Sequence, residues 1–368
     1  MLKRIEDKVR DVIQGVDYVM YMLLNPFKFK QFPKLVRKIL VVELFNIGDV
    51  IVMTPVLRAL RNRYPNAQID VLTKKGMDMV LAGNPQCNHV FSYAGFFGSL
   101  DKLKKENYDM GVVLHPGSLK ISFLLLMAGV RYRVGCAKAG ITYGKGFFLN
   151  KKVFPNNQWQ HKVDDNLDVV QAIGVMPKGR HVELSVSKDA ERKVKKLLKQ
   201  RHRPWIGVNA ASRHKSQRWY PEGFAEVVNH YASSGKGTII FTGVKEEGSQ
   251  VEEILKMLRR KEDVVNMVGR TSFEELKALV KNLDVLVTVD SAPLHIASAF
   301  NTPVVALFGP TIPQFWGPVG KGGEAIWKEK QACVGCRRYV CVYNKGYECM
   351  KSITPAEVVK KSDGLLKR

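Results

Sequence analysis

The sequence predicts an α/β protein with two doubly wound domains, each a parallel sheet with helices on both faces. Short, continuously apolar runs alternate with helical segments, which is the rhythm of βαβ units. This rhythm occurs twice, starting near residue 38 and again near residue 205, with a highly charged helical segment between the two series. A chain of 368 residues is long enough for two hydrophobic cores.

The first series starts with a strand at Lys38-Ile-Leu-Val-Val-Glu43. A helix follows from about 50 to 63, with Thr54-Pro55 near its start, and it closes before Pro65. The pattern then predicts strands at 68–72, 88–92 and 108–114 and helices at 76–81, 99–106, 119–129 and 164–173. The Gly- and Lys-rich segment 137–152 is typical of a loop.

We place the domain boundary after the charged helix in 182–200, which gives domains 38–200 and 201–368. The second series predicts strands at 205–209, 237–242, 263–267, 284–289 and 303–308 and helices at 249–260 and 272–282. Thr271 and Glu274 have the spacing of a capping box. A cysteine cluster and a terminal helix complete this domain.

Residues 1–37 form a basic leader with a helical stripe of Ile5, Val9, Val12, Val16, Val19 and Leu23, followed by alternating Phe and Lys. Together with the net charge of +24, this segment predicts an anchor on an anionic membrane surface. A helix packed on the body of the protein would show the same stripe, and both interpretations stay open.

Several classes of protein lack support in the sequence. No apolar run reaches the roughly 18–20 residues that cross a bilayer, and no cleavable signal peptide is recognisable, so we expect a cytoplasmic protein that is soluble or peripheral. The first strand is not followed by G-x-G-x-x-G, and a P-loop motif does not occur. The basic residues form no pattern typical of nucleic-acid recognition, so the net charge alone favours a nucleic-acid-binding protein.

In the first domain, Asn46-Ile-Gly-Asp49 stands where the first strand ends and a helix begins. Gly48 would let the backbone turn closely beside a substrate, and Asp49 would face a ligand there. One carboxylate beside a sugar hydroxyl is sufficient for general-base catalysis. On position alone, a purely structural helix-capping role for Asp49 is slightly favoured.

In the second domain, polar residues follow three strands. Lys215 and Arg218 concentrate positive charge after the first strand, where a diphosphate could lie. Glu246 follows the second strand and could hold ribose hydroxyls, although an exposed glutamate at a helix start would look the same. Asp290-Ser291-Ala292 precedes an Ala-rich helix that contains His295, and Gly309 and Thr311 follow the next strand. Free backbone N–H groups at such a helix start bind phosphate.

Four cysteines lie within 17 residues, at Cys333, Cys336, Cys341 and Cys349. This spacing is compatible with a metal site, with an iron–sulfur cluster or with two disulfides. We interpret the cluster as a structural cross-link, and the sequence leaves open whether a metal or disulfides form it.

These motifs together resemble glycosyltransferase family 9, the heptosyltransferases of the lipopolysaccharide inner core, over about residues 38–359. The motifs that carry the resemblance are Ile39–Leu60 around Asn46-Ile-Gly-Asp49, Arg218-Trp-Tyr-Pro221, Asp290-Ser-Ala-Pro-Leu-His295 and Leu307-Phe-Gly-Pro-Thr-Ile-Pro313. The resemblance implies a GT-B fold: two Rossmann-like domains that face a central cleft, with acceptor on the first and nucleotide-sugar on the second.

The resemblance also implies inverting, metal-independent transfer of heptose from ADP-heptose to a lipopolysaccharide core acceptor, without a cofactor. Asp49 takes the position of the general base, with Asn46, Gly48 and Thr54 on the acceptor side. The expected donor-binding residues are Lys215, Arg218, Glu246, Asp290, Ser291, Ala292, His295, Gly309 and Thr311. The expected partners are the nucleotide-sugar, an anionic lipid-linked saccharide and the inner face of the cytoplasmic membrane, with no nucleic acid.

The chain departs from the family pattern at two places. Gln217-Arg218 stands where the family often has two basic residues before Trp, and Tyr220 separates Trp219 from Pro221. Ala292 stands where the donor motif often has Gly, and its methyl group changes how closely a donor can approach the backbone. A GT-B enzyme with another nucleotide-sugar or acceptor, an epimerase and a nucleic-acid-binding protein remain the alternatives.

Overall fold

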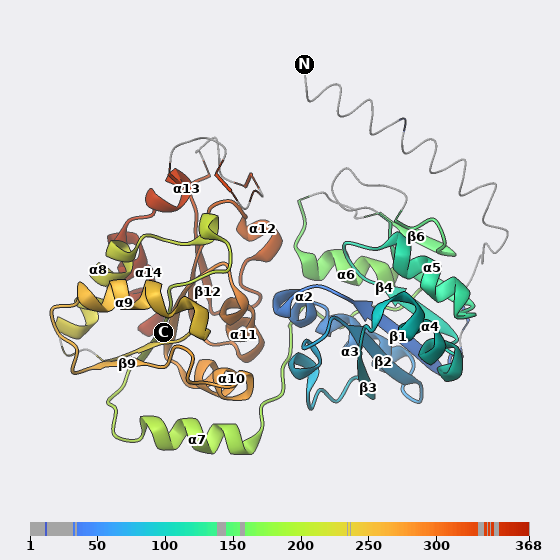
Figure 1. The fold of residues 1–368 in the computed structure, drawn as a ribbon, viewed down its shortest axis with the longest axis horizontal. Coiled ribbons are helices and arrows are strands. Elements are labelled where there is room, and N and C mark those ends of the chain that lie inside the picture. Colours follow the sequence, from blue (N-terminus) through green and yellow to red (C-terminus); the bar gives the residue numbers. More distant parts are fainter. Residues whose placement is uncertain are drawn as a thin grey trace. The chain divides into compact units, whose positions relative to one another are not determined.

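The chain forms two units, Met1–Arg180 and His181–Arg368 (Figure 1). The computed structural model describes residues 12, 32–33, 35–137, 145–154, 159–233, 235, 237–329, 335–336, 338, 340–341 and 346–367. Most of the basic leader 1–37, and with it the predicted amphipathic anchor, lies outside the described residues. Before the first strand, the Phe32 ring is 5.6 Å from the Tyr132 ring, and Tyr64 donates a hydrogen bond to the Pro33 carbonyl.

The first unit contains a six-stranded parallel sheet in the order β3-β2-β1-β4-β5-β6. Its strands are β1 (Lys38–Glu43), β2 (Gln68–Thr73), β3 (His89–Ser92), β4 (Met110–Val113), β5 (Tyr132–Cys136) and β6 (Lys151–Val153). β1 and β4 are neighbours in space although β2 and β3 lie between them in sequence. The strand order therefore reverses between β1 and β4, which is where open α/β sheets bind ligands.

Helices cover both faces of this sheet. They are α2 (Ile47–Val52), α3 (Thr54–Arg63), the 3-10 turn η1 (Asp78–Leu81), α4 (Gly95–Glu106), α5 (Leu119–Met127) and α6 (Lys162–Gln171). α4 and α5 bury Leu100, Leu103 and Leu124 against Leu40 and Val42 of β1. The alternate residues Ile39 and Val41 are also fully buried, as expected for a central strand covered on both faces.

The second unit repeats this architecture with the strand order β12-β11-β10-β7-β8-β9. Its parallel strands are β7 (Trp205–Asn209), β8 (Thr238–Phe241), β9 (Val264–Asn266), β10 (Val285–Val289), β11 (Val304–Leu307) and β12 (Gly323–Ile326). Here the order reverses between β7 and β10. The prediction of two Rossmann-like, doubly wound parallel sheets is confirmed.

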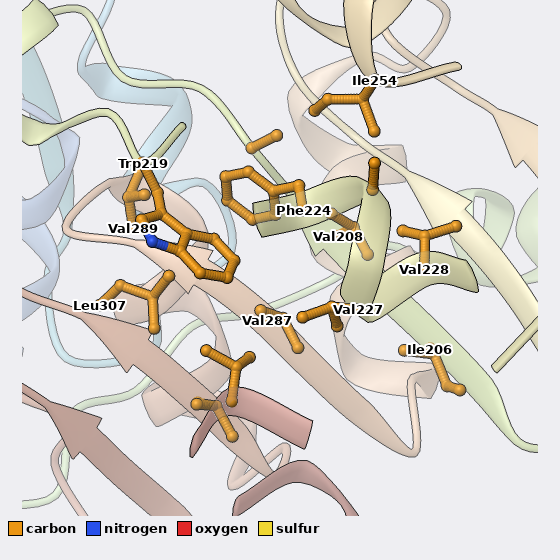
Figure 2. Close-up of a cluster of buried hydrophobic side chains, with 14 of the residues drawn as sticks. Ile206, Val208, Trp219, Phe224, Val227, Val228, Ile254, Val287, Val289 and Leu307 are labelled. Carbon is orange, nitrogen blue, oxygen red and sulfur yellow. The ribbon is translucent and has the colours of Figure 1, made fainter. Parts of the chain in front are cut away.

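The helical elements of the second unit are α7 (Lys188–Leu198), η2 (Lys215–Gln217), α8 (Pro221–Ser233), η3 (Lys245–Glu247), α9 (Gly248–Lys256), α10 (Phe273–Asn282), α11 (Ala292–Phe300), α12 (Pro313–Trp316), α13 (Glu348–Lys351) and α14 (Pro355–Leu366). Trp219, which the sequence places in a family motif, is buried in the core among strand residues such as Val289 and Leu307 (Figure 2). Its indole N–H donates to the Ile353 carbonyl at 3.1 Å, and its ring meets Phe224 edge-on. Trp219 thus joins the start of α8 to the segment before α14.

The structure divides the chain between Arg180 and His181, so α7, which precedes the predicted boundary at 200/201, lies in the second unit. Lys281 of α10 contacts Glu191 of α7 at 2.5 Å, and the Ser187 N–H donates to Glu274 at 3.1 Å. The fully buried Lys277 donates to the Ser185 carbonyl at 2.7 Å and so fixes the segment before α7. A charged helix next to a composition change looks like a linker, but these ion pairs join it to α10.

Three strands and one helix cap also differ from the sequence predictions. β5, β6 and β12 were not expected, since they are short and interrupted by Arg133, by Lys151-Lys152 and by Glu324. The capping box of α10 uses Ser272 and Glu275, one residue later than the predicted Thr271 and Glu274. In the described part of the chain, no helix is both long and apolar enough to span a bilayer.

Candidate active site

Each unit gathers polar side chains where its strand order reverses. In the first unit, Val42 of β1 pairs with Val113 of β4, so the segments after both strands meet at one edge of the sheet. In the second unit, Asn209 of β7 pairs with Thr288 of β10. Every residue that the sequence marks as a site candidate, apart from the cysteines, follows one of the strands β1, β7, β8, β10 or β11. Carboxyl ends of parallel strands are the usual place for ligands in such sheets.

Asp49 lies in the first turn of α2, directly after β1. Its carboxylate is half-buried and accepts a hydrogen bond from the Asn46 N–H at 3.1 Å. Burial raises the pKa of Asp49 from 3.8 to about 6, while the Asn46 N–H and the positive charge of Lys162 act to lower it. A carboxylate whose pKa is close to neutrality can accept a proton during a reaction and release it afterwards.

Glu43, the last residue of β1, is a second acid at this edge. It is buried, and its carboxyl oxygen accepts a hydrogen bond from the Phe45 N–H at 3.1 Å. Burial and, secondly, the charge of Asp49 raise the pKa of Glu43 well above its ordinary value. The two carboxyl groups are coupled: burial disfavours the ionised form of both, and the charge of Asp49 adds to this effect at Glu43.

A basic cluster lies at the same edge, after β4. The Lys162 ammonium, at the start of α6, lies 3.4 Å from His115 Nε2 and forms an ion pair with Asp165. The His115 N–H donates to the Asn166 side chain at 3.0 Å, which ties the segment after β4 to α6. Burial raises the pKa of Asp165, and Lys162 opposes this shift. α6 packs against α2, so the cluster brings a cation to the element that carries Asp49.

Three further charged side chains on elements that pack against α2 have other partners or are exposed. Asp164 pairs with Arg180 at 2.7 Å, Arg61 donates to backbone carbonyls and to Asn88, and Asp78 is exposed on η1. The positive charge of Lys162 favours the ionised form of the Asp49 carboxylate.

The remaining acceptor-side candidates have different surroundings. Asn46 is exposed and directly precedes α2, and Gly48 lies within the first turn of α2 rather than in a sharp loop. Thr54 is fully buried, and its hydroxyl donates to the Ile51 carbonyl at 2.8 Å. Thr54 therefore lies at the junction of α2 and α3, away from solvent.

In the second unit, Asp290 connects three of the segments that follow strands. Its carboxylate accepts hydrogen bonds from Thr311 after β11 at 2.6 Å and from Gln217 after β7 at 3.0 Å. Gln217 in turn accepts a hydrogen bond from Ser212 at 2.9 Å. The predicted pair Asp290 and Thr311 is thus brought together, and Gln217 joins them.

The start of α11 is organised by Asn209, the last residue of β7. The Ser291 hydroxyl donates to the Asn209 side chain at 2.8 Å, and Asn209 donates to the Thr242 carbonyl at 3.0 Å. Ser291 precedes α11, and Ala292 is its first residue, so the backbone N–H groups of its first turn point to this edge. His295 is buried one turn further along, with its ring edge-on to Trp316 at 5.9 Å.

The basic loop after β7 lies on the same side of the sheet. Lys215 is exposed on η2, whereas Arg218 is half-buried and donates to the Ser212 carbonyl at 2.7 Å. Glu246 is exposed, but its neighbour Glu247 is half-buried and accepts from the Val244 N–H at 3.0 Å. Burial raises the pKa of Glu247, and Arg218 opposes this shift, so Glu247 is the acid next to the basic loop.

Gly309 is buried and packs on α13. A Cβ atom there would lie 2.5 Å from the Met350 sulfur and 3.0 Å from the Cys349 sulfur. Cys349 is buried on α13, Cys336 and Cys341 are half-buried on the preceding loop, and Cys333 lies outside the described residues. Within the described part of the chain, His, Cys, Asp and Glu side chains form no group of three that could hold a metal ion.

Sequence reasoning missed four residues of these clusters: Glu43, Asn209, Gln217 and Lys162. Glu43 and Asn209 are the final residues of predicted strands, so their position was the signal that could have identified them. Lys162 could not be found in this way, because it follows no predicted strand and reaches the site from a helix start.

Comparison with known proteins identifies the family of this chain. The model of glycosyltransferase family 9 (heptosyltransferase) matches residues 99–346. Lipopolysaccharide heptosyltransferase 3 of Escherichia coli (strain K12) is 27% identical over 299 residues, covering 76% of this chain and 85% of that protein. Lipopolysaccharide heptosyltransferase 2 of the same strain is 26% identical over 359 residues, covering 89% and 98%.

The fold agrees as well. The solved structure of E. coli ADP-heptose lipopolysaccharide heptosyltransferase II has a TM-score of 0.74 and 24% sequence identity, and the match covers 90% of this chain and 98% of that one. Two Rossmann-like units of this kind make up the GT-B fold, as predicted. Because the family model spans more than half of the sequence, the chain belongs to glycosyltransferase family 9 (heptosyltransferase) and is a glycosyltransferase.

Proposed function

We propose that this enzyme transfers heptose from ADP-heptose to a lipopolysaccharide core acceptor, with inversion at the anomeric carbon and without a metal or cofactor. Family membership supports glycosyl transfer, and the named activities of the relatives support this donor and acceptor. The observation that carries the chemistry is Asp49: a carboxylate with a pKa of about 6 at the ligand-binding edge of the first unit.

In the proposed reaction, Asp49 removes the proton of the acceptor hydroxyl. The acceptor oxygen then attacks the anomeric carbon of heptose, while the bond from that carbon to the diphosphate oxygen breaks. The proton ends on Asp49, and the electron pair leaves with ADP. A single displacement of this kind inverts the anomeric configuration. Lys162 supports the step by favouring the ionised form of Asp49 before the proton is transferred.

The leaving diphosphate needs positive charge on the second unit. Lys215, Arg218 and the N–H groups at the start of α11 supply it, which is the role a metal ion has in other transferases. Asp290, held by Gln217 and Thr311, and the buried His295 shape the donor pocket. For the ribose hydroxyls we favour Glu247 over Glu246, because Glu247 is half-buried beside Arg218.

We further propose that the enzyme works as a peripheral protein at the inner face of the cytoplasmic membrane. Its acceptor would be anionic and lipid-linked, and the net charge of +24 suits both that acceptor and an anionic membrane surface. We do not expect nucleic acid as a partner, because the chain belongs to a transferase family whose proposed acceptor is itself anionic.

A donor screen tests the proposal. ADP-, GDP- and UDP-sugars are compared by their effect on thermal unfolding, and those that bind are tested for transfer to core oligosaccharides. We expect ADP-heptose to stabilise the protein most and to yield a product one heptose heavier. Stabilisation by a GDP- or UDP-sugar with no response to ADP-heptose would favour a different nucleotide-sugar. Product formed from donor alone would indicate an epimerase.

A further inference from the structure

Helix α5 is apolar on two faces, although a surface helix needs only one. Ile121, Leu124 and Leu125 are buried against the sheet. Leu119, Phe123 and Met127 are exposed and spaced four residues apart, so they share a second stripe along the helix. Large apolar side chains in one exposed stripe indicate a surface that another body covers.

The stripe continues onto neighbouring elements. The Phe123 ring is 4.8 Å from the Phe148 ring and 5.7 Å from the Phe96 ring, at the start of α4. Phe97, which contacts Phe96 at 5.4 Å, is 79% exposed, the most exposed aromatic side chain among the described residues. We call Phe97, Leu119, Phe123, Met127, Lys120 and Lys145 the α4–α5 surface.

The charge around these apolar residues is positive. Lys120 follows Leu119 and lies 5.8 Å from the Tyr93 ring, and Lys145 lies in the turn whose carbonyl accepts from Ser122 of α5. Neither α5 nor residues 145–148 contain an acid. On α4, Asp101 and Glu106 stand against Lys102, Lys104 and Lys105, and Glu106 is paired with Lys38 at 3.2 Å.

We propose that the α4–α5 surface docks on an anionic lipid bilayer. Its apolar stripe would enter the boundary between headgroups and acyl chains, and its lysines would meet lipid phosphates. The leader of this chain is a poorer occupant, because its first 38 residues carry nine Lys or Arg and four acids and so repel a basic surface.

The α4–α5 surface lies near the sheet edge that carries Asp49, so docking there would bring this edge to the membrane. α5 begins soon after β4 and α4 soon after β3, so both helices start at the sheet edge that carries Asp49. A bilayer on this surface would lie close to that edge, where a lipid-linked acceptor would be presented. This purpose rests on the proposed function, whereas the binding itself does not.

Vesicle co-sedimentation of the full chain tests the docking. Leu119→Ser/Phe123→Ser should weaken binding to vesicles of phosphatidylcholine and phosphatidylglycerol by at least about tenfold. Lys120→Gln should weaken it about fivefold, and this loss should vanish on pure phosphatidylcholine. Lys120→Gln removes no apolar contact, so it keeps the test valid if the double variant folds poorly. Met176→Ser is the matched control, since Met176 is 73% exposed on the same unit but outside the surface.

The outcomes separate this proposal from the proposed function. Transfer to a delipidated soluble acceptor should be unchanged in every variant, while transfer to an acceptor in vesicles should fall with binding. Vesicle binding that responds to the substitutions without any heptose transfer by the wild type would support docking and reject the proposed donor and acceptor. Unchanged vesicle binding in both variants would overturn the docking. So would wild-type self-association that Leu119→Ser/Phe123→Ser abolishes in the absence of vesicle binding.

Discussion

Replacing Asp49 with asparagine should abolish transfer and, above pH 6, make the protein more stable. Burial raises the pKa of Asp49 from 3.8 to about 6, so ionising this residue in the folded state costs up to about 3 kcal/mol at neutral pH. Asparagine has nearly the same size and keeps an oxygen for the hydrogen bond from the Asn46 N–H. The substitution therefore removes the cost and keeps the contact.

The sign of the pH dependence follows from the direction of the shift. Because the folded-state pKa is raised, the folded chain holds a proton between pH 3.8 and about 6 that the unfolded chain has released. The stability from this proton is fully present below pH 3.8 and is lost as the pH rises through about 6. The difference in the free energy of unfolding between the variant and the wild type, called the gap below, should thus be smallest near pH 3.5 and largest near pH 7.5.

Urea unfolding, followed by far-UV circular dichroism at pH 3.5, 5 and 7.5, measures this gap. The matched control is Asp78→Asn, because Asp78 is an exposed acid on η1 of the same unit. It should unfold like the wild type at each pH. A gap for Asp49→Asn that is absent, or that has the same size at pH 3.5 and 7.5, would refute the reasoning that burial sets the state of Asp49.

The transfer rate should fall on the acid side of its pH profile as Asp49 becomes protonated, and Lys162→Met should move this acid limb above pH 6, because the cation favours the ionised base. Lys162→Arg should restore the limb, and an unmoved limb in Lys162→Met would contradict this role of the cation. Glu43→Gln should not raise the limb, because it removes a carboxyl group whose charge repels that of Asp49, and pH–rate profiles check both expectations. Thr311→Val removes a 2.6 Å hydrogen bond to Asp290 and should weaken ADP binding about tenfold in calorimetry; unchanged affinity would place Asp290 outside the donor site. Trp219→Ala should destabilise the second unit by about 3–5 kcal/mol in urea, and a loss below about 1 kcal/mol would contradict its role in the core.

The central strands could be predicted from sequence because they are buried on both faces. β1, β7, β10 and β11 are continuous apolar runs, so each was found. Outer strands such as β6 and β12 carry charges and depend on pairing with a neighbour rather than on their own composition. The position of the unit boundary could not be predicted for a similar reason: α7 belongs to the second unit through contacts with α10 that local composition does not reveal.

The candidate site could be predicted only where its residues directly follow a strand. Asp49 and Asp290 have that position, and each carboxylate accepts a hydrogen bond from a neighbouring segment. Thr54 also follows the motif in sequence, but a helix turns its hydroxyl into the interior. Lys162 reaches Asp49 from a helix more than a hundred residues later, and only the packing of α6 on α2 brings it there.

A transfer assay with ADP-heptose and a lipopolysaccharide core acceptor, read by mass spectrometry, tests the central claim most directly when wild type and Asp49→Asn are compared. We predict an acceptor one heptose heavier with the wild type, formed only when both substrates are present. Asp49→Asn should yield no such product although it still binds ADP-heptose. Transfer by Asp49→Asn at the wild-type rate would contradict the assignment of the base, and consumption of ADP-heptose without an acceptor would contradict transfer itself.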